Sequence, residues 1–231
     1  MTEAVEGWPV TRASVLRTAL SVGVATGAYG VSFGALGVAG GLSVVQTCAM
    51  SVLLFTGGSQ FALIGVLGGG GSPVSGTASA VLLGVRNVVY GASLAGMLRL
   101  HGLRRLVGAQ LVIDESTAVA LGAEPNGERA SRLGFWATGL AVFVLWNLAT
   151  LVGALAGSVI GDTAALGLDA AAPAAFLALL WPRLNSRPTW LTALTAALVA
   201  VLAVPFVPAG VPVLIAALVP AIAVLARRRA A

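Results

Sequence analysis

Hydrophobic residues along this chain form long runs, and short clusters of arginine separate one run from the next. Two of the uncharged stretches, 19–47 and 190–226, are longer than the about 20 residues that a helix needs to cross a hydrocarbon core of about 30 Å. We therefore predict an all-α polytopic membrane protein with a single transmembrane domain over residues 1–231.

Arginine clusters beside hydrophobic runs mark the cytoplasmic ends of membrane helices. The clusters are Arg12/Arg17, Arg99/Arg104/Arg105, Arg129/Arg132, Arg183/Arg187 and Arg227 to Arg229. If all of them face the cytoplasm, an even number of crossings separates each neighbouring pair. Both termini are then cytoplasmic in a cell (plasma) membrane, with 1–15 as an N-terminal segment and 99–108 as a basic loop.

The run at 43–69 conflicts with this rule if it crosses the membrane completely. It lies between two other runs, 18–40 and 73–98, and three full crossings would place Arg99 outside. Gly57-Gly58-Ser59-Gln60 divides the run into halves of about 13 residues, or about 20 Å each, which is too short to cross. We therefore predict that the run enters and returns on one side, and a seventh full crossing is the alternative.

The stretch 109–122 also lies between two arginine clusters, and Asp114 and Glu115 interrupt its hydrophobic sequence. It is predicted as a second re-entrant or membrane-dipping helix. After Arg132 the expected crossing helices are 133–158, 170–182, 188–204 and 211–226. The total is about six full transmembrane helices plus one or two broken or re-entrant segments.

Composition supports a membrane protein and argues against other classes. The chain is 58% hydrophobic and 9% charged, whereas ordinary globular domains carry about 25% charged residues. The net charge of +5 comes from arginines beside hydrophobic runs, so it indicates membrane topology rather than nucleic-acid binding. No metal-ligand spacing, P-loop or catalytic motif is present, so we expect no enzyme activity, no cofactor and no metal site.

Arg86 is the most informative charge, because it lies near the centre of the run 73–98. A charge at that depth costs at least about 2.5–3.5 kcal/mol on insertion scales, so it should face a partner or a wet cavity. Asn87 is its neighbour, and Tyr90 lies one turn further along the same helix face. The candidate counter-charges are Asp114, Glu115 and Asp169.

These charges allow more than one interpretation. Arg86 could lock the bundle through an ion pair, or it could belong to a substrate or coupling-ion site. Asp114 and Glu115 could be solvated at the membrane interface, and Asp169 could cap a helix.

A broken helix inside the membrane suits a transport site. The N-terminus of a half-helix offers free N–H groups and a positive dipole end to a carboxylate, and a half-helix C-terminus offers carbonyls to an ammonium group. Ser59 and Gln60 add neutral hydrogen-bonding groups. Together these features predict a site for a zwitterion such as an amino acid.

Two segments, GVSFGALGVAGGLSVVQTCAMSVLLFTGGSQF and SPVSGTASAVLLGVRNVVYGASLAGML, resemble the AzlC-type branched-chain amino acid permeases. The D-E-S at 114–116 and the run GLDAAAPAAFLALLWPRL at 167–184 follow in the same order, and the resemblance covers residues 15–225. It implies the large subunit of a branched-chain amino acid exporter that pairs with a small hydrophobic partner of the AzlD type. One departure is that Asn87 stands where the family often has histidine, so a proton-coupling role for that histidine does not transfer.

The candidate residues combine the resemblance with the argument from the residues. The substrate-binding candidates are Phe33, Gly34, Gly57, Gly58, Ser59, Gln60, Phe61, Arg86, Asn87 and Tyr90. The coupling or ion-pair candidates are Asp114, Glu115 and Asp169. Phe33, Phe55 and Phe61 could line a pocket for an apolar side chain, or they could be ordinary core or lipid-facing aromatics.

The expected function is secondary transport, with export of Val, Leu, Ile or Met as the first hypothesis. The expected partners are the lipid bilayer, the amino acid substrate and the AzlD-type subunit, and no nucleic acid. Two alternatives stay open at this point, which are a channel-like pore with re-entrant helices and a membrane scaffold without transport of its own.

Overall fold

A computed structural model describes residues 8–160, 174, 177 and 180–230. All the regular elements of this described part are helices. Asp169 and most of the predicted helix 170–182 lie outside the described residues. The expected all-helical architecture is confirmed for the rest.

Three helices are long and apolar enough to cross a membrane: α2 (Trp8–Ala39), α5 (Pro73–Leu98) and α8 (Glu128–Ile160). The start of α5 shows why the chain becomes helical there. The Ser72 side chain accepts a hydrogen bond from the backbone N–H of Ser75, and Pro73 occupies the first helical position, where no N–H is needed. Arg99, in the left-handed conformation, ends the same helix.

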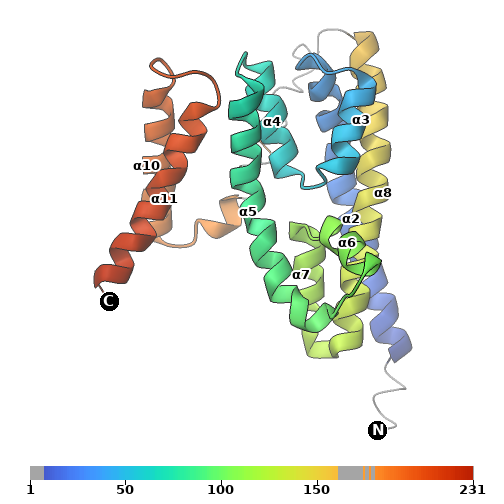
Figure 1. The fold of residues 1–231 in the computed structure, drawn as a ribbon. Coiled ribbons are helices and arrows are strands. Elements are labelled where there is room, and N and C mark those ends of the chain that lie inside the picture. Colours follow the sequence, from blue (N-terminus) through green and yellow to red (C-terminus); the bar gives the residue numbers. More distant parts are fainter. Residues whose placement is uncertain (1–7, 161–173, 175–176, 178–179, 231) are drawn as a thin grey trace.

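The helices α2 and α8 run parallel and pack closely along their length (Figure 1). Their contacts advance in the same direction, since Gly23 faces Ala141 and Gly34 faces Thr150. A Cβ atom on Gly23 would lie 2.8 Å from the Cβ of Ala141, and one on Gly34 would overlap the carbonyl oxygen of Thr150. Small residues are what allow membrane helices to approach this closely.

The run 43–69 is broken, as the arginine pattern predicted. It forms α3 (Val44–Leu53) and α4 (Gly58–Gly68), joined by the non-helical residues 54–57. In Figure 1, α3 runs down to mid-height and α4 returns to the upper end. A Cβ on Gly68 would lie 3.7 Å from the Cα of Gly40, so the chain comes back to the place where α2 ended.

A second broken pair enters from the opposite end. It consists of α6 (Leu103–Gln110) and α7 (Asp114–Gly122), and the short 3-10 helix η1 (Glu124–Asn126) leads on to α8. The predicted basic loop 99–108 is therefore helical from Leu103, because Leu103, Leu106 and Val107 give this segment an apolar face. The predicted N-terminal segment 1–15 likewise includes the first residues of α2.

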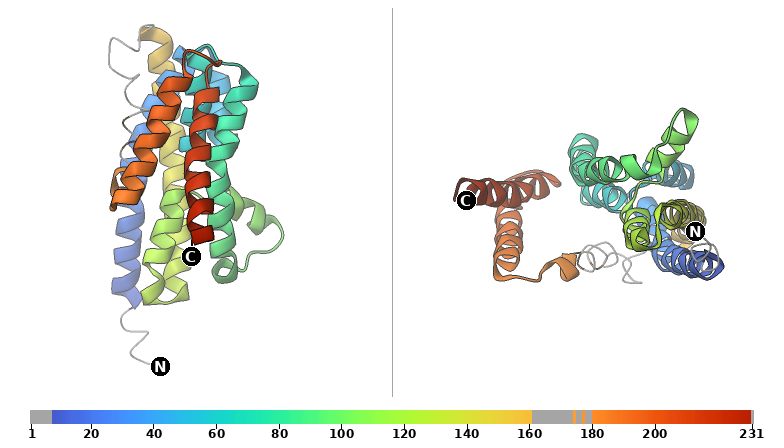
Figure 2. Two further views of the ribbon diagram at one scale, coloured as in Figure 1. Left: turned by 90° about the vertical axis from the view of Figure 1, so that its left-hand side faces the viewer. Right: turned by 90° about the horizontal axis from the view of Figure 1, so that it is seen from below.

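The last two helices form a separate hairpin beside α5 (Figure 2). They are α10 (Arg187–Ala203) and α11 (Val211–Ala230), close to the predicted 188–204 and 211–226, and η4 (Trp181–Arg183) precedes them. The hairpin turn is attached to the start of α5, where Ser75 Oγ donates to the carbonyl oxygen of Ala209 at 3.1 Å.

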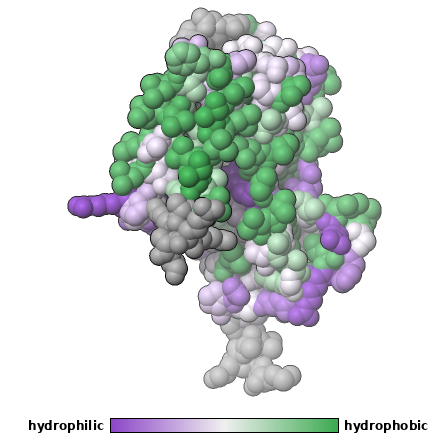
Figure 3. Space-filling view, turned by 60° about the vertical axis from the view of Figure 1, so that its left-hand side comes forward, coloured by the Kyte–Doolittle hydropathy of each residue, from purple (hydrophilic) through white to green (hydrophobic). Residues whose placement is uncertain are grey.

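Hydrophobic side chains cover much of the outer surface, and Figure 3 shows hydrophilic residues gathering toward the lower end of the face it displays. Exposed valines and leucines recur on α5, α8, α10 and α11. Such a surface is stable in lipid, where apolar side chains need no cover. The described part therefore gives a membrane protein with three clear spans and several shorter apolar helices.

Candidate functional site

Residues of the two helix breaks line a partly open cavity of about 210 Å³. A cavity of roughly 150 Å³ can hold benzene, so this one has room for a small organic molecule. Its wall comes from α2, the first break, α4, α5, α7 and α8. The lining residues are Thr26, Tyr29, Phe55, Thr56, Gly57, Gly58, Phe61, Arg86, Ile113, Asp114, Glu115, Val142 and Trp146.

Arg86 pairs with Asp114, which settles which of the candidate carboxylates within the described part is its partner. The Nη2 atom of Arg86 lies 2.8 Å from Oδ2 of Asp114, and the Tyr90 hydroxyl donates to Oδ1 of the same carboxylate at 2.8 Å. The same Nη2 atom lies 3.5 Å from the carbonyl oxygen of Thr56 in the first break. The ion pair thus connects α5 with both helix breaks and lines the cavity as well.

A second hydrogen bond joins the two broken pairs directly. The Gln110 side chain, at the end of α6, donates through Nε2 to the carbonyl oxygen of Val52 near the end of α3, at 2.6 Å. This carbonyl belongs to the last turn of a half-helix, where backbone oxygens lack intrahelical partners. The two breaks therefore hold each other in place.

Glu115 differs from its neighbour Asp114 because it has no cation at ion-pair distance in the described part of the chain. Its nearest hydrogen-bond partner is the Thr26 hydroxyl, whose Oγ1 is 3.5 Å from Oε1. The residue is half-buried and lines the cavity. A carboxyl group is thus available to a ligand.

Two half-helices begin at the cavity, α4 at Gly58 and α7 at Asp114. The first turn of α7 carries Asp114 and Glu115, which compensate its positive dipole end, whereas the first turn of α4 carries no acidic residue. Gly57, the residue before α4, has a φ of 57°, a backbone conformation that residues other than glycine rarely adopt. The wall therefore presents a helix N-terminus without an acidic residue in its first turn, as well as a carboxyl group that has no ion-pair partner in the described part.

Gln60 and Ser59 are fully buried and do not line this cavity. Gln60 instead bridges the first break, since its Nε2 is 3.3 Å from the carbonyl oxygen of Ser51 and 3.4 Å from that of Met50. Its Oε1 accepts from the backbone N–H of Gly57 at 3.2 Å. The side chain thus replaces hydrogen bonds that the backbone loses where the helix stops.

Aromatic side chains form the apolar part of the wall. Phe61 and Trp146 line the cavity, and Phe33 lies behind them, 5.7 Å from Phe61 and 5.9 Å from Trp146 between ring centroids. Phe55 also lines it, packed edge to face on Phe143 at 5.0 Å. Of the three phenylalanines considered from the sequence, two reach the cavity and the third supports it.

Three other candidates lie near the cavity without lining it. Gly34 lies at the contact of α2 with α8, and Tyr90 acts on the cavity through Asp114. Asn87 has a buried Oδ1 atom for which the described part shows no hydrogen-bond partner. Some of the predicted residues therefore line the cavity, and others contact the residues that do.

Six residues of the cavity wall were not among the candidates from the sequence: Thr26, Tyr29, Thr56, Ile113, Val142 and Trp146. Thr26 and Tyr29 lie three residues apart in α2, so their spacing alone places both on one helix face. Trp146 gives no such signal, because a tryptophan in an apolar helix is usually a core or interfacial residue. Its indole Nε1 is buried without a partner in the described part, which fits a group kept for a ligand.

The comparisons with known proteins agree with this reading of the sequence. A family model described as "AzlC protein" matches residues 21–160, which include both helix breaks and all the residues that line the cavity. Neither the curated proteins nor the solved structures give a match. The resemblance noted in the sequence is therefore confirmed. The chain belongs to the AzlC family, which is associated with branched-chain amino acid transport.

Proposed function

We propose that this protein is a secondary transporter that exports branched-chain or similar apolar amino acids, and that the cavity between the two helix breaks is its substrate site. The family supports the general function. The main support for the site is that the wall of one cavity holds both the Glu115 carboxyl, which has no ion-pair partner in the described part, and the start of α4, whose first turn has no acidic residue.

Each part of an apolar amino acid has a chemical counterpart on this wall. The α-ammonium group would pair with Glu115, which has no cation of its own in the described part. The α-carboxylate would accept hydrogen bonds from free N–H groups at the start of α4, beside Gly58. The side chain would pack against Phe55, Phe61 and Trp146, which suits Val, Leu, Ile or Met.

The arrangement of the helices also suits a carrier. Broken helices whose ends meet near mid-membrane at the interface of two oppositely oriented units are a recurring substrate site in secondary transporters. Here the pair α3–α4 and the pair α6–α7 enter from opposite ends. The resemblance further implies a small hydrophobic AzlD-type partner in the plasma membrane, which we include in the proposal.

The same two re-entrant pairs favour a channel-like pore as the second candidate, since small-solute channels also use half-helices. A pore would show flux that rises linearly with concentration and no counterflow. A carrier saturates and exchanges labelled for unlabelled substrate. A scaffold subunit would show no flux with or without its partner.

The test is counterflow of labelled Val, Leu, Ile and Met in liposomes that contain the purified protein, alone and together with the small hydrophobic partner. Glu115→Gln keeps the size of the side chain and removes its charge, so we expect the apparent substrate affinity to fall at least about tenfold. Glu124→Gln, on the exposed helix η1, is the matched control and should transport normally. Wild-type KM and rate in Glu115→Gln would refute the assignment of the ammonium site.

A further inference from the structure

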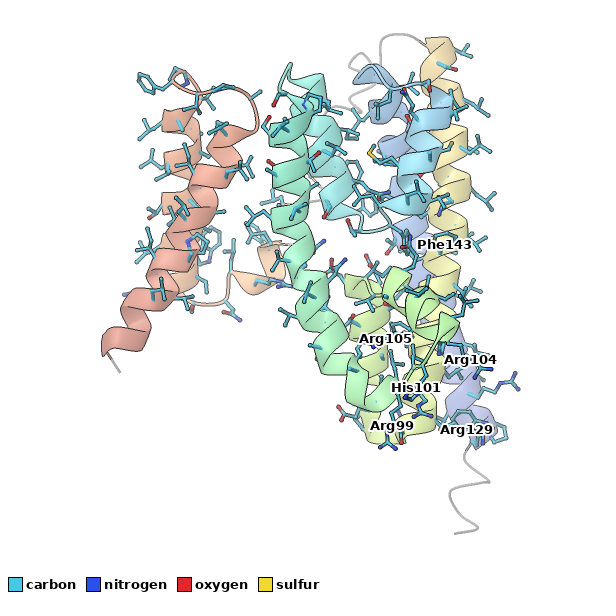
Figure 4. All side chains as sticks on the ribbon, viewed as in Figure 1. Arg99, His101, Arg104, Arg105, Arg129 and Phe143 are labelled. Carbon is cyan, nitrogen blue, oxygen red and sulfur yellow. The ribbon has the colours of Figure 1, made fainter. Side chains whose placement is uncertain are left out.

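The short helix α6 exposes large apolar side chains beside exposed arginines. Leu103 is 77% exposed, Leu106 68% and Val107 48%, while Arg104 and Arg105 are exposed on the same helix. Figure 4 shows Arg99, His101, Arg104 and Arg105 around the connection from α5 to α6 at the lower end of the bundle. A helix of this kind is stable at a membrane interface, with its apolar side chains in the acyl region.

Two cavities flank this helix and share part of their walls. One, of about 770 Å³, brings Arg104 together with Val107 and Trp136, and the other, of about 540 Å³, brings Arg105 together with Ala109. Arg99 and His101 line both cavities. No Asp or Glu lines either one, so their charge is one-sided within the described part.

The arginines differ in how far they are already engaged. Arg132 is occupied, since it pairs with Glu128 and donates to the carbonyl oxygen of Met97 at 2.9 Å. Arg99 uses only its Nε atom, which donates to the carbonyl oxygen of Gly96 at 3.0 Å. Arg104 and Arg105 have neither an ion pair nor a hydrogen bond to another described residue. Their guanidinium groups can therefore bind an external anion.

We propose that the cavity lined by Arg99 and Arg104 binds an anionic phospholipid, with its phosphate on these two arginines and its acyl chains along Leu103, Val107 and Trp136. Arg105, in the adjoining cavity that shares Arg99, adds to the positive charge beside the phosphate. A soluble anion would satisfy the arginines but leave the apolar walls exposed. A zwitterionic lipid would cover the apolar walls but bring no net negative charge. Basic pockets between membrane helices recognise anionic head groups for both reasons together.

The ordinary alternative is that these arginines only add to the general positive charge at this end of the membrane. Arg12 and Arg17 on α2 are exposed arginines of the predicted cytoplasmic end and line neither cavity. Arg12→Gln/Arg17→Gln and Arg104→Gln/Arg105→Gln remove the same charge from that end. A difference between the two double variants therefore measures the site rather than the overall charge.

The experiment titrates the purified full chain, stripped of lipid in detergent, with phosphatidylglycerol and with phosphatidylcholine, and follows lipid adducts by native mass spectrometry. We expect tighter binding of phosphatidylglycerol, weakened at least about tenfold in Arg104→Gln/Arg105→Gln and less than about twofold in Arg12→Gln/Arg17→Gln. Equal weakening in both double variants, or no preference between the two lipids, would overturn the proposal. Competition by glycerol 1-phosphate, which has the phosphate without acyl chains, would also overturn it by showing a site for soluble anions.

Discussion

At the scale of single residues, Arg86 contacts both helix breaks. It binds Asp114 at the start of α7 and approaches the carbonyl oxygen of Thr56 in the first break. Its side chain is 29% exposed and that of Asp114 is 21% exposed, so the pair is shielded only in part. Arg86 forms an ion pair and also lines the cavity, so the two interpretations from the sequence do not exclude each other.

Replacing both partners of this pair should cost less stability than the sum of the losses from replacing each partner alone. Arg86→Met leaves the Asp114 carboxylate without a cation, and Asp114→Asn leaves Arg86 without an anion. Fully buried pairs lose about 3–5 kcal/mol in this way, so we expect about 2 kcal/mol for each single variant here. Thermal unfolding in detergent should show the double variant losing less than the sum of the two, and strictly additive losses would contradict the coupling.

Gln60 leads to a prediction that separates the stability of the break from substrate binding. Gln60→Leu removes all three hydrogen bonds across the break and leaves the Gly57 N–H and the Ser51 carbonyl oxygen without this partner. Because these groups are left unsatisfied, we expect a loss of about 1–3 kcal/mol. If Gln60 acts only on the break, the transport activity that remains should have a KM near that of the wild type. A KM that rises in proportion to the stability loss would instead place Gln60 in the substrate site.

At the scale of elements, the close packing of α2 on α8 requires glycine at particular positions. A Cβ atom on Gly34 would overlap the carbonyl oxygen of Thr150, and one on Gly153 would overlap that of Val31. These atoms belong to the backbone, which cannot move aside as a flexible side chain can. The two helices that support Trp146 and Thr26 are therefore held at one fixed separation.

Gly34→Ala should push α2 and α8 apart and lower the stability by about 1–3 kcal/mol. Gly91→Ala on α5 is the matched control, because a Cβ there meets no atom within 4 Å. It should be neutral or stabilise the helix by about 0.5–1 kcal/mol, since alanine loses less entropy than glycine in a helix. Unfolding curves of the two variants in the same detergent test this, and equal behaviour would show that the helices can separate without loss.

The sequence predicted where the helices lie along the chain better than which side of each helix faces the cavity. The arginine clusters on either side disfavour a full crossing at 43–69 and at 109–122, and glycines mark the first break, so the first broken pair could be predicted. The second was expected as a basic loop followed by one dipping helix, whereas the structure has two short helices there. Which side of a half-helix faces the cavity depends on its neighbours, and this is why the sequence could not show that Gln60 does not line the cavity. Trp146 was missed because the sequence does not show that α8 runs beside both breaks.

At the scale of the whole molecule, the described chain alternates long helices with broken pairs. The order is α2, then α3–α4, then α5, then α6–α7, then α8, and each broken pair ends in a half-helix that starts at the cavity. The two pairs enter the bundle from opposite ends (Figure 1), and both contribute residues to the wall of the cavity. If each pair covers the cavity from its own end, movement of one pair at a time would open it to one side only, which is what alternating access requires.

This arrangement makes a prediction about which segments face which side of the membrane. Leu42 precedes α3 and Ser72 follows α4, so cysteines placed at these positions should both react from one side. Asn126 in η1 lies at the other end of the bundle, and a cysteine there should react from the opposite side. If the run 43–69 crossed completely, as in the alternative with seven crossings, Leu42 and Ser72 would react from opposite sides.

The measurement uses single cysteines in a Cys48→Ala background and a membrane-impermeant maleimide, first on intact cells and then after permeabilisation. The positive-inside rule further predicts that Asn126→Cys, near Arg129, is protected in intact cells, whereas Leu42→Cys and Ser72→Cys are labelled. Phe206→Cys, 83% exposed in the turn between α10 and α11, extends the test to the last hairpin and should behave like Ser72→Cys, because Ser75 binds that turn. Labelling of Asn126→Cys in intact cells, with protection of the other three, would show that the protein has the opposite orientation but the same fold. If Leu42→Cys and Ser72→Cys reacted from opposite sides, the re-entrant pair itself would be refuted.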